Sequence, residues 1–208
     1  MEFIKQYKGK ALQKITEKAR QTGDYFLSLK RDGQMIQIAY DGDELVKFWS
    51  SNGHPFYNKN LANQIIANCK WAFHVEAEYT GTSEGMMGDR GKSSKITTYR
   101  TQFAKGIQSD GIGDEMCWVF DVLSFGGLDV RQDNFEDRIG CLQQLGYSKG
   151  FRPVLQTAAV TIDEAVLELD PAIELGYEGL ILTHSSHTIG TSGPVSYTHL
   201  TLPTTPYV

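Results

Sequence analysis

Apolar and polar residues follow two different periods in the first part of the chain. Residues 11–20 place apolar side chains at helical spacing, and Gly23 ends this helix. Polar and apolar residues then alternate, as they do in β-strands, in three short runs at 24–31, 34–40 and 44–50. Asp-Gly pairs, which are typical of tight turns, separate these runs. The pattern predicts a helix followed by an antiparallel meander of three strands.

A second helix and a fourth strand come next. The run at 61–69 has helical spacing, and the run at 71–79 alternates. In this expected strand, one face carries Val75, Ala77 and Tyr79, and the other carries His74, Glu76 and Glu78. We therefore expect two carboxylates to leave the sheet on the same side.

The rest of the chain mixes loop, strand and helix signals. Residues 80–93 are too rich in glycine and serine for regular structure, so we expect a long loop. Strand signals follow at 116–125, 151–156 and 178–183, and helix signals at 135–145 and 161–176, with a break at Pro171. Sheet and helix signals in this mixture predict one α+β domain built on antiparallel sheet.

The residues from about Pro194 onward do not continue this pattern. They carry no charged side chain and have a bias toward threonine and proline that is absent elsewhere. This segment resembles translated adapter sequence at the end of a gene model. We therefore expect 194–208 to be a non-native tail on a C-terminally incomplete domain that spans 1–193.

Composition narrows the class of protein. The chain has 208 residues, of which 40% are hydrophobic, and a net charge of -5, so any contact with nucleic acid must come from a local basic cluster. Cys69, Cys117 and Cys141 lie far apart, which favours neither a disulfide framework nor a zinc ribbon. The chain has no apolar signal region and no membrane-length apolar stretch. We expect a soluble cytoplasmic monomer with no membrane partner.

The sequence Lys30-Arg31-Asp32-Gly33 is the first candidate for chemistry. It places a lysine at the end of one strand and an Asp-Gly turn before the next. A lysine held there is partly removed from water, which favours the neutral amine that a nucleophile must be. Taken alone, the four residues are better explained as an ordinary hairpin with a charged rim, because such short motifs recur by chance.

Four further short sequences follow the lysine motif in a defined order. They are Ser51-Asn52-Gly53, Val75-Glu76-Ala77-Glu78, Val119-Phe120-Asp121 and Glu178-Gly179-Leu180-Ile181. In order and spacing, the five motifs resemble the covalent nucleotidyltransferases, the superfamily of DNA ligases, RNA ligases and mRNA capping enzymes, whose signature begins K-x-D-G. The resemblance implies an α+β nucleotidyltransferase fold, an ATP-grasp-like adenylation domain of antiparallel sheets flanked by helices.

Within this superfamily the chain looks most like the compact, phage-type ATP-dependent DNA ligases. It reaches Lys30 early, and its loop at 89–101 is similar to theirs. The resemblance implies that Lys30 attacks the α-phosphate of ATP, with Asp32 in the same catalytic motif. The resulting lysyl-AMP passes AMP to a 5′-phosphate at a nick in double-stranded DNA, and the 3′-hydroxyl then seals the strand.

The resemblance also assigns the remaining site residues. Glu78 and Glu178 would contact the nucleotide and hold Mg²⁺, a hard ion that suits carboxylates and phosphate oxygens. Phe120 would stack on the base. Without Lys30, the two glutamates would be interpreted as solvated strand-edge carboxylates and Phe120 as a core ring.

A basic cluster stands in the loop region of this acidic chain. We expect four of its residues to contact the nucleic-acid backbone: Arg90, Lys92, Lys95 and Arg100. For any one of them, a solvated helix face is an equally good explanation. No Walker-type phosphate loop occurs, so phosphate must be bound by other groups.

The sequence departs from the family's pattern near the site. Ser28 stands where many ligases have an acid that reads the adenine amino group. Met35 and Ser51 replace arginines, and Thr183 replaces a basic residue. The family's last motif, K-x-K, and the oligonucleotide-binding barrel beyond it are missing from the sequence. These departures remove nucleotide contacts that the family mechanism normally uses.

Three alternatives stay open at this point. An RNA ligase would share the chemistry, and a capping-type enzyme would use GTP and a 5′-diphosphate RNA. A non-catalytic nucleic-acid-binding module would use the basic loop alone, with Lys30 as a hairpin residue.

Overall fold

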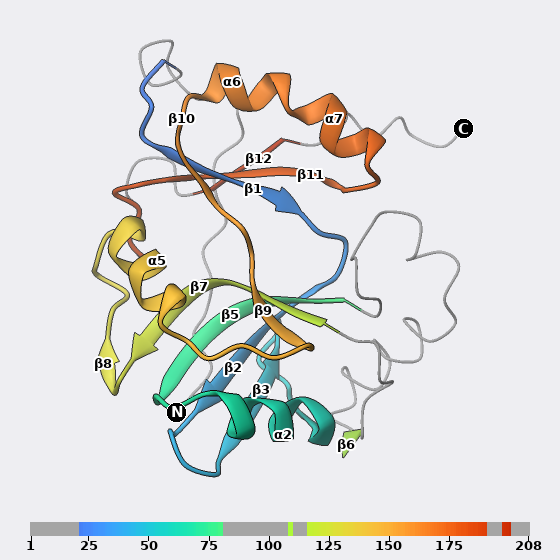
Figure 1. Ribbon diagram of the computed structural model, residues 1–208, viewed down its shortest axis with the longest axis vertical. Helices are drawn as coiled ribbons and strands as arrows, with labels where there is room; N and C mark the ends of the chain where they lie inside the picture. Colours follow the sequence, from blue (N-terminus) through green and yellow to red (C-terminus); the bar gives the residue numbers. More distant parts are fainter. Residues whose placement is uncertain (1–20, 81–107, 110–115, 191–196, 201–208) are drawn as a thin grey trace.

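The computed structural model describes residues 21–80, 108–109, 116–190 and 197–200 (Figure 1). In this part of the chain the strands form a four-stranded sheet and an eight-stranded sheet. The small sheet has the order β10 (Thr157–Val160), β1 (Tyr25–Lys30), β11 (Gly179–His184) and β12 (Tyr197–Leu200), and its pairs are antiparallel. The proposed tail boundary at 194 stays a prediction, although Tyr197–Leu200 pairs with β11.

The large sheet carries most of the core. Its order is β6 (Gln108–Ser109), β4 (Pro55–Asn58), β3 (Val46–Ser50), β2 (Gln34–Tyr40), β5 (Phe73–Thr80), β7 (Met116–Phe125) and β8 (Leu128–Asp129), and β9 (Phe151–Pro153) also pairs with β7. The pairs β4–β6 and β7–β9 are parallel, and the others are antiparallel. The α+β class expected from the sequence is confirmed.

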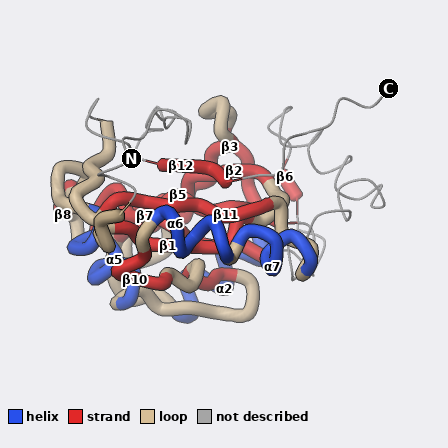
Figure 2. The backbone as a smooth tube through the Cα atoms, turned by 90° about the horizontal axis from the view of Figure 1, so that it is seen from above, coloured by secondary structure: helices blue, strands red, loops and turns tan. Residues whose placement is uncertain are grey.

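In the described residues, helices lie on the outer faces of both sheets and at one side of them. They are α2 (Lys59–Asn68), α5 (Phe135–Gln143), α6 (Ile162–Leu167) and α7 (Leu169–Glu174). Figure 2 shows α6 and α7 lying over β1 and β11, and α2 lies on the far side of the large sheet in Figure 1. The two sheets therefore lie face to face between two helical layers.

Separate apolar clusters explain this layering. Leu61, Ala62 and Ile65 of α2 pack into the core of the large sheet, while α6 and α7 pack on the small sheet through a second cluster. A third cluster joins Phe26 of β1 to Phe135 of α5. Helix α5 also contributes Leu142 to the large core, so it bridges the two sheets at one side.

One expectation about pairing is wrong. β1 pairs with β10 and β11 in the small sheet, whereas β2 pairs with β3 and β5 in the large sheet. Residues 31–33 therefore cross from one sheet to the other, and Asp32-Gly33 is not a hairpin turn. Alternation shows where strands begin and end, but the partners of β1 come from distant segments whose pairing local sequence does not encode.

Other local expectations are confirmed or corrected. Val75, Ala77 and Tyr79 share the core face of β5 as expected. The helical passage at 161–176 breaks at Glu168, ahead of Pro171, because proline is tolerated only in the first turn of a helix. The helix expected at 11–20 and almost all of the loop expected at 80–93 lie outside the described residues. Within the described ranges, no helix has both the length and the apolar character needed to cross a membrane.

Candidate active site

The strand that carries Lys30 presents two different faces. Tyr25, Leu27 and Leu29 pack against the cluster beneath α6 and α7. Since neighbouring side chains on a strand point to opposite sides, Ser28 and Lys30 face the large sheet instead. Lys30 is the last residue of β1, so its side chain lies where the chain leaves the small sheet.

Lys30 contacts Glu178, the residue just before β11, which is the neighbouring strand in the small sheet. β1 and β11 are in register with Lys30 opposite Gly179, and the backbone N–H of Glu178 donates to the carbonyl of Lys30 at 3.0 Å. The Nζ of Lys30 forms an ion pair with the Glu178 carboxylate. The two side chains are 17% and 27% exposed, so the pair lies in a partly open position.

Close packing at Gly33 brings Glu78 to the same crossover. A Cβ atom at Gly33 would lie 2.4 Å from the carbonyl oxygen of Tyr79 and 3.0 Å from Oε1 of Glu78. A glycine is needed here because the backbone of β5 leaves no room for a side chain. The crossover that begins after Lys30, and that includes Asp32, thus runs between Glu178 on one sheet and Glu78 on the other.

Phe120 lies on a bulge of β7. Ala77 pairs with Val119 and Glu76 pairs with Asp121, so Phe120 is the extra residue between them. Its neighbours Val119 and Val122 belong to the core cluster of the described residues, whereas Phe120 does not and is partly exposed. The bulge therefore turns this ring out of the core, on the strand next to the one that carries Glu78.

The two carboxylates of β5 have different surroundings. Glu76 is buried and accepts a hydrogen bond from the side-chain amide of Gln37 at 3.0 Å, and the Gln37 oxygen accepts from Nε2 of His74 at 3.1 Å. Burial lowers the pKa of His74 to about 4, so its ring is neutral. Glu78 is only partly buried, which leaves it the more accessible of the two.

An ion pair that sequence reasoning missed lies beside Phe120. Arg138 of α5 donates from Nε and Nη2 to the two oxygens of Asp121, at 2.7 and 3.0 Å, and from Nη1 to the carbonyl of His187 at 2.7 Å. Neither side chain is exposed to solvent. The signal was present, because Arg138 occupies a core position in the helical pattern of Phe135, Ile139 and Leu142, and a buried arginine needs a partner.

The structure also places three of the residues that depart from the family's pattern. Ser28 is buried opposite Ile181, and Thr183 is buried opposite Phe26, both in the small sheet. Met35 pairs with Glu78 across β2 and β5. The four basic residues expected to contact nucleic acid, Arg90, Lys92, Lys95 and Arg100, lie outside the described residues.

The carboxylates near Lys30 are of the kind and number that Mg²⁺ takes beside phosphate, and they do not make an all-protein metal site. No group of three or more His, Cys, Asp or Glu side chains suited to a metal occurs within the described ranges. Mg²⁺ typically takes one or two carboxylates, with phosphate oxygens and water completing its shell. Glu78 and Glu178, on either side of the crossover, supply that number.

Solved structures of DNA ligases share this fold. A mycobacterial DNA ligase D complexed with ATP is 14% identical, with a TM-score of 0.55 over 84% of this chain and 53% of its own. A Lig E DNA ligase is 18% identical, with a TM-score of 0.59 over 97% of this chain and 68% of its own. A Chlorella virus DNA ligase-adenylate is 11% identical, with a TM-score of 0.57 over 86% and 61% of the two chains.

Sequence comparison identifies the family. A comparison with curated protein sequences gives no match. The chain spans about half the length of the mycobacterial ligase chain to which it is similar. The profile of the ATP-dependent DNA ligase domain matches residues 6–190, which is most of the chain. The chain therefore belongs to the ATP-dependent DNA ligase domain family.

Proposed function

We propose that this chain is the adenylation domain of a DNA ligase that joins nicks in double-stranded DNA, with Lys30 as the residue that carries AMP. One observation carries the proposal. Lys30 ends β1 at the crossover between the two sheets, in contact with Glu178 and next to the segment that packs on Glu78. A primary amine thus lies against one carboxylate, at a crossover that packs on a second one, in a chain of the ATP-dependent DNA ligase domain family.

The first chemical step requires an amine at a fixed position. The Lys30 ammonium would first give up a proton, for which the paired Glu178 carboxylate is a nearby acceptor; the neutral Nζ would then attack the α-phosphate of ATP, and a P–N bond would form as the bond from the α-phosphorus to pyrophosphate breaks. The ion pair with Glu178 and the backbone bond from Glu178 to Lys30 hold this side chain at the end of β1. Positioning of this kind accounts for much of the catalysis in phosphoryl transfer.

The other groups near the crossover have consistent roles. Glu78 and Glu178 would hold Mg²⁺, which when bound neutralises phosphate charge. Phe120, turned out of the core by the bulge in β7, would stack on the adenine ring. The basic residues Arg90, Lys92, Lys95 and Arg100 would contact the DNA backbone.

Later steps involve the acceptor. The adenylate would move from Lys30 to the 5′-phosphate at the nick, and the 3′-hydroxyl on the other side would displace AMP. We infer that the protein acts as a monomer in the cytoplasm, on a nicked duplex.

The proposal is tested by labelling the protein with nucleotide. The chain is incubated with Mg²⁺ and α-labelled ATP or GTP and is then separated by denaturing electrophoresis. We expect a covalent label from ATP that is absent from Lys30→Ala and Lys30→Arg. A label from GTP alone would indicate a capping-type enzyme instead.

The acceptor is tested separately. Nicked duplexes of DNA, of RNA and of the two combined are offered to the labelled protein, and we expect AMP transfer and sealing on the DNA nick. Preferred sealing of an RNA nick would indicate an RNA ligase. Nucleic-acid binding without any label, also in a chain extended by an oligonucleotide-binding domain, would support the non-catalytic binding module.

A further inference from the structure

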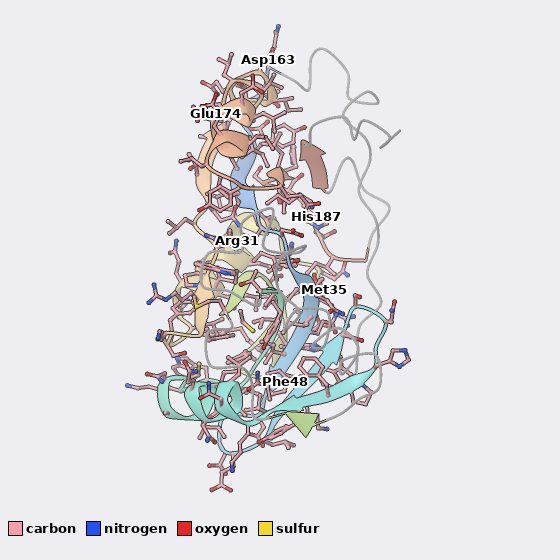
Figure 3. All side chains as sticks on the ribbon, turned by 90° about the vertical axis from the view of Figure 1, so that its right-hand side faces the viewer. Arg31, Met35, Phe48, Asp163, Glu174 and His187 are labelled. Carbon is pink, nitrogen blue, oxygen red and sulfur yellow. The ribbon has the colours of Figure 1, made fainter. Side chains whose placement is uncertain are left out.

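Arg31, which follows Lys30 in the chain, stacks its cationic side chain on an aromatic ring. The guanidinium carbon of Arg31 lies 3.4 Å from the centroid of the Trp118 ring and 5.4 Å from that of Tyr177. Figure 3 shows Arg31 at the level of the crossover, between the part of the molecule built on the small sheet and the part built on the large sheet. The family signature leaves this position open, and the proposed reaction gives the residue no role.

The two rings belong to different parts of the site. Trp118 is on β7 of the large sheet, where it pairs directly with Glu78. Tyr177 precedes Glu178, which pairs with Lys30 at the edge of the small sheet. Arg31 therefore contacts the immediate neighbours of both carboxylates that flank the crossover.

The stack acts on the backbone of the crossover. Arg31 comes directly after the last residue of β1, and its guanidinium group reaches Trp118 on β7 of the large sheet. The backbone of Lys30 is tied to Glu178 on the small sheet, and Gly33 packs on β5 of the large sheet. Arg31 adds a third fixed point between these two, and a planar guanidinium stacks on aromatic rings in a way that an ammonium does not.

We propose that Arg31 is a positioning residue, which holds the crossover against Trp118 and so fixes Lys30 in line with the nucleotide. The inference rests on the proposed function, because it concerns the rate at which Lys30 reacts. A displacement of about 1 Å in a reacting group can slow a reaction by about 100-fold. Loss of the stack is therefore expected to slow the formation of the lysine adduct while leaving the binding of ATP largely unchanged.

The test is a mutant cycle in the rate of adduct formation. Arg31→Met removes the cation at similar length, Trp118→Leu removes the aromatic face, and Trp118→Phe keeps an aromatic face. For each variant, and for Arg31→Met combined with Trp118→Leu, the rate of labelling is measured as the ATP concentration is raised. The saturating rate and the half-saturating ATP concentration are obtained separately, because they report positioning and binding respectively.

A positioning role predicts a specific result. Arg31→Met and Trp118→Leu should each lower the saturating rate by about 10- to 100-fold, with less than about a threefold change in the half-saturating concentration. The double variant should be no slower than the slower single variant, because both changes remove the same contact. Trp118→Phe should keep most of the rate.

Other results would overturn the inference. Unchanged saturating rates, or effects that multiply in the double variant, would show that the stack does not position Lys30. A higher half-saturating concentration at an unchanged rate would mean that Arg31 binds ATP directly. If neither the unsubstituted chain nor the chain extended by an oligonucleotide-binding domain takes label, the proposed function fails as well, whereas labelling of the unsubstituted protein with unaffected variants refutes the inference alone.

Circular dichroism is used to check that every variant is folded. If Arg31→Met or Trp118→Leu loses structure, Arg31→Lys replaces it, since lysine keeps the charge and nearly the length but lacks the planar group. The expected result is then a folded protein with the same loss of saturating rate. A folded Arg31→Lys variant at the full rate would overturn the inference.

Discussion

Two ion pairs of this molecule, Lys30 with Glu178 and Arg138 with Asp121, are built differently. Lys30 meets Glu178 through a single ammonium in a partly exposed position. Arg138 meets Asp121 through two parallel hydrogen bonds, donates to backbone carbonyls as well, and is excluded from water. Loss of one partner is therefore expected to cost several kcal/mol in the second pair, which is buried, and little in the first, which is partly exposed.

The largest expected effect comes from breaking the buried pair. Arg138→Met leaves the Asp121 carboxylate without its cation in the interior, which is expected to lower the free energy of unfolding by about 3 to 5 kcal/mol. Urea denaturation measures this change. The matched control is Arg131→Met, which breaks the exposed pair of Arg131 with Asp129, at 2.5 Å, and should change stability by less than about 1 kcal/mol. Equal effects at the two sites would remove the distinction between a buried and an exposed pair.

The substitution Gly33→Ala tests the close approach of the crossover to β5. In Gly33→Ala the new methyl group would lie 2.4 Å from the Tyr79 carbonyl, so the crossover must shift. We expect a loss of about 1 to 3 kcal/mol in the free energy of unfolding, and slower labelling of Lys30, measured on the same preparations.

A second glycine provides the control for that change. A Cβ atom at Gly140, inside α5, would meet nothing within 4 Å. Gly140→Ala should therefore stabilise the protein by about 0.5 to 1 kcal/mol through helix propensity. A neutral or stabilising Gly33→Ala would contradict the packing described for the crossover.

The strands around Lys30 show what local sequence can and cannot predict. The strand boundaries around Lys30 and the common face of Val75, Ala77 and Tyr79 follow from periodicity, which local sequence encodes. The sheet to which β1 belongs does not, because its partners β10 and β11 come from the far end of the described chain. Sequence motifs assigned Glu178 to the site of Lys30, and the structure brings the two residues together.

For charged residues that belong to no motif, the sequence predicts burial at best and does not predict the partner. Arg138 lies at a core position of its helix, so its burial could have been predicted, but its partner Asp121 is on a strand with no helical relationship to it. The stack of Arg31 on Trp118 joins two sheets, and no periodicity in one segment encodes a contact between sheets. Such contacts depend on the three-dimensional arrangement of the elements.

The hydrogen-bonded network of His74, Gln37 and Glu76 predicts that the stability of the fold depends on pH. The pKa of His74 is lowered to about 4 by burial, below the value of about 6.5 for an unperturbed histidine. Between these values the unfolded chain binds a proton that the folded chain excludes, so stability falls as the pH decreases from about 6.5 toward about 4. The slope for one such group is at most about 1.4 kcal/mol per pH unit.

A non-titrating variant isolates this contribution. His74→Gln can still donate to Gln37 but binds no proton, so its unfolding free energy should fall less between pH 7 and pH 5 than that of the unsubstituted chain. Urea denaturation at both pH values measures the difference. His187, whose pKa burial also lowers to about 4, is unchanged in both proteins and contributes equally to both. Parallel pH profiles would show that the His74 ring is not held neutral by the fold.

The smallest expected change in stability belongs to the pair that matters most for the proposed chemistry. Lys30→Met removes one partner of a partly exposed ion pair and keeps the length of the side chain, so the free energy of unfolding should change by less than about 1 kcal/mol. The same variant should take no label from ATP. Since Arg138→Met likewise replaces the cation of an ion pair by methionine, the two variants measured side by side separate a residue needed for the fold from one needed for reaction. A loss of several kcal/mol in Lys30→Met would mean that Lys30 is a structural joint like Arg138, and that the missing label reports unfolding instead of a missing nucleophile.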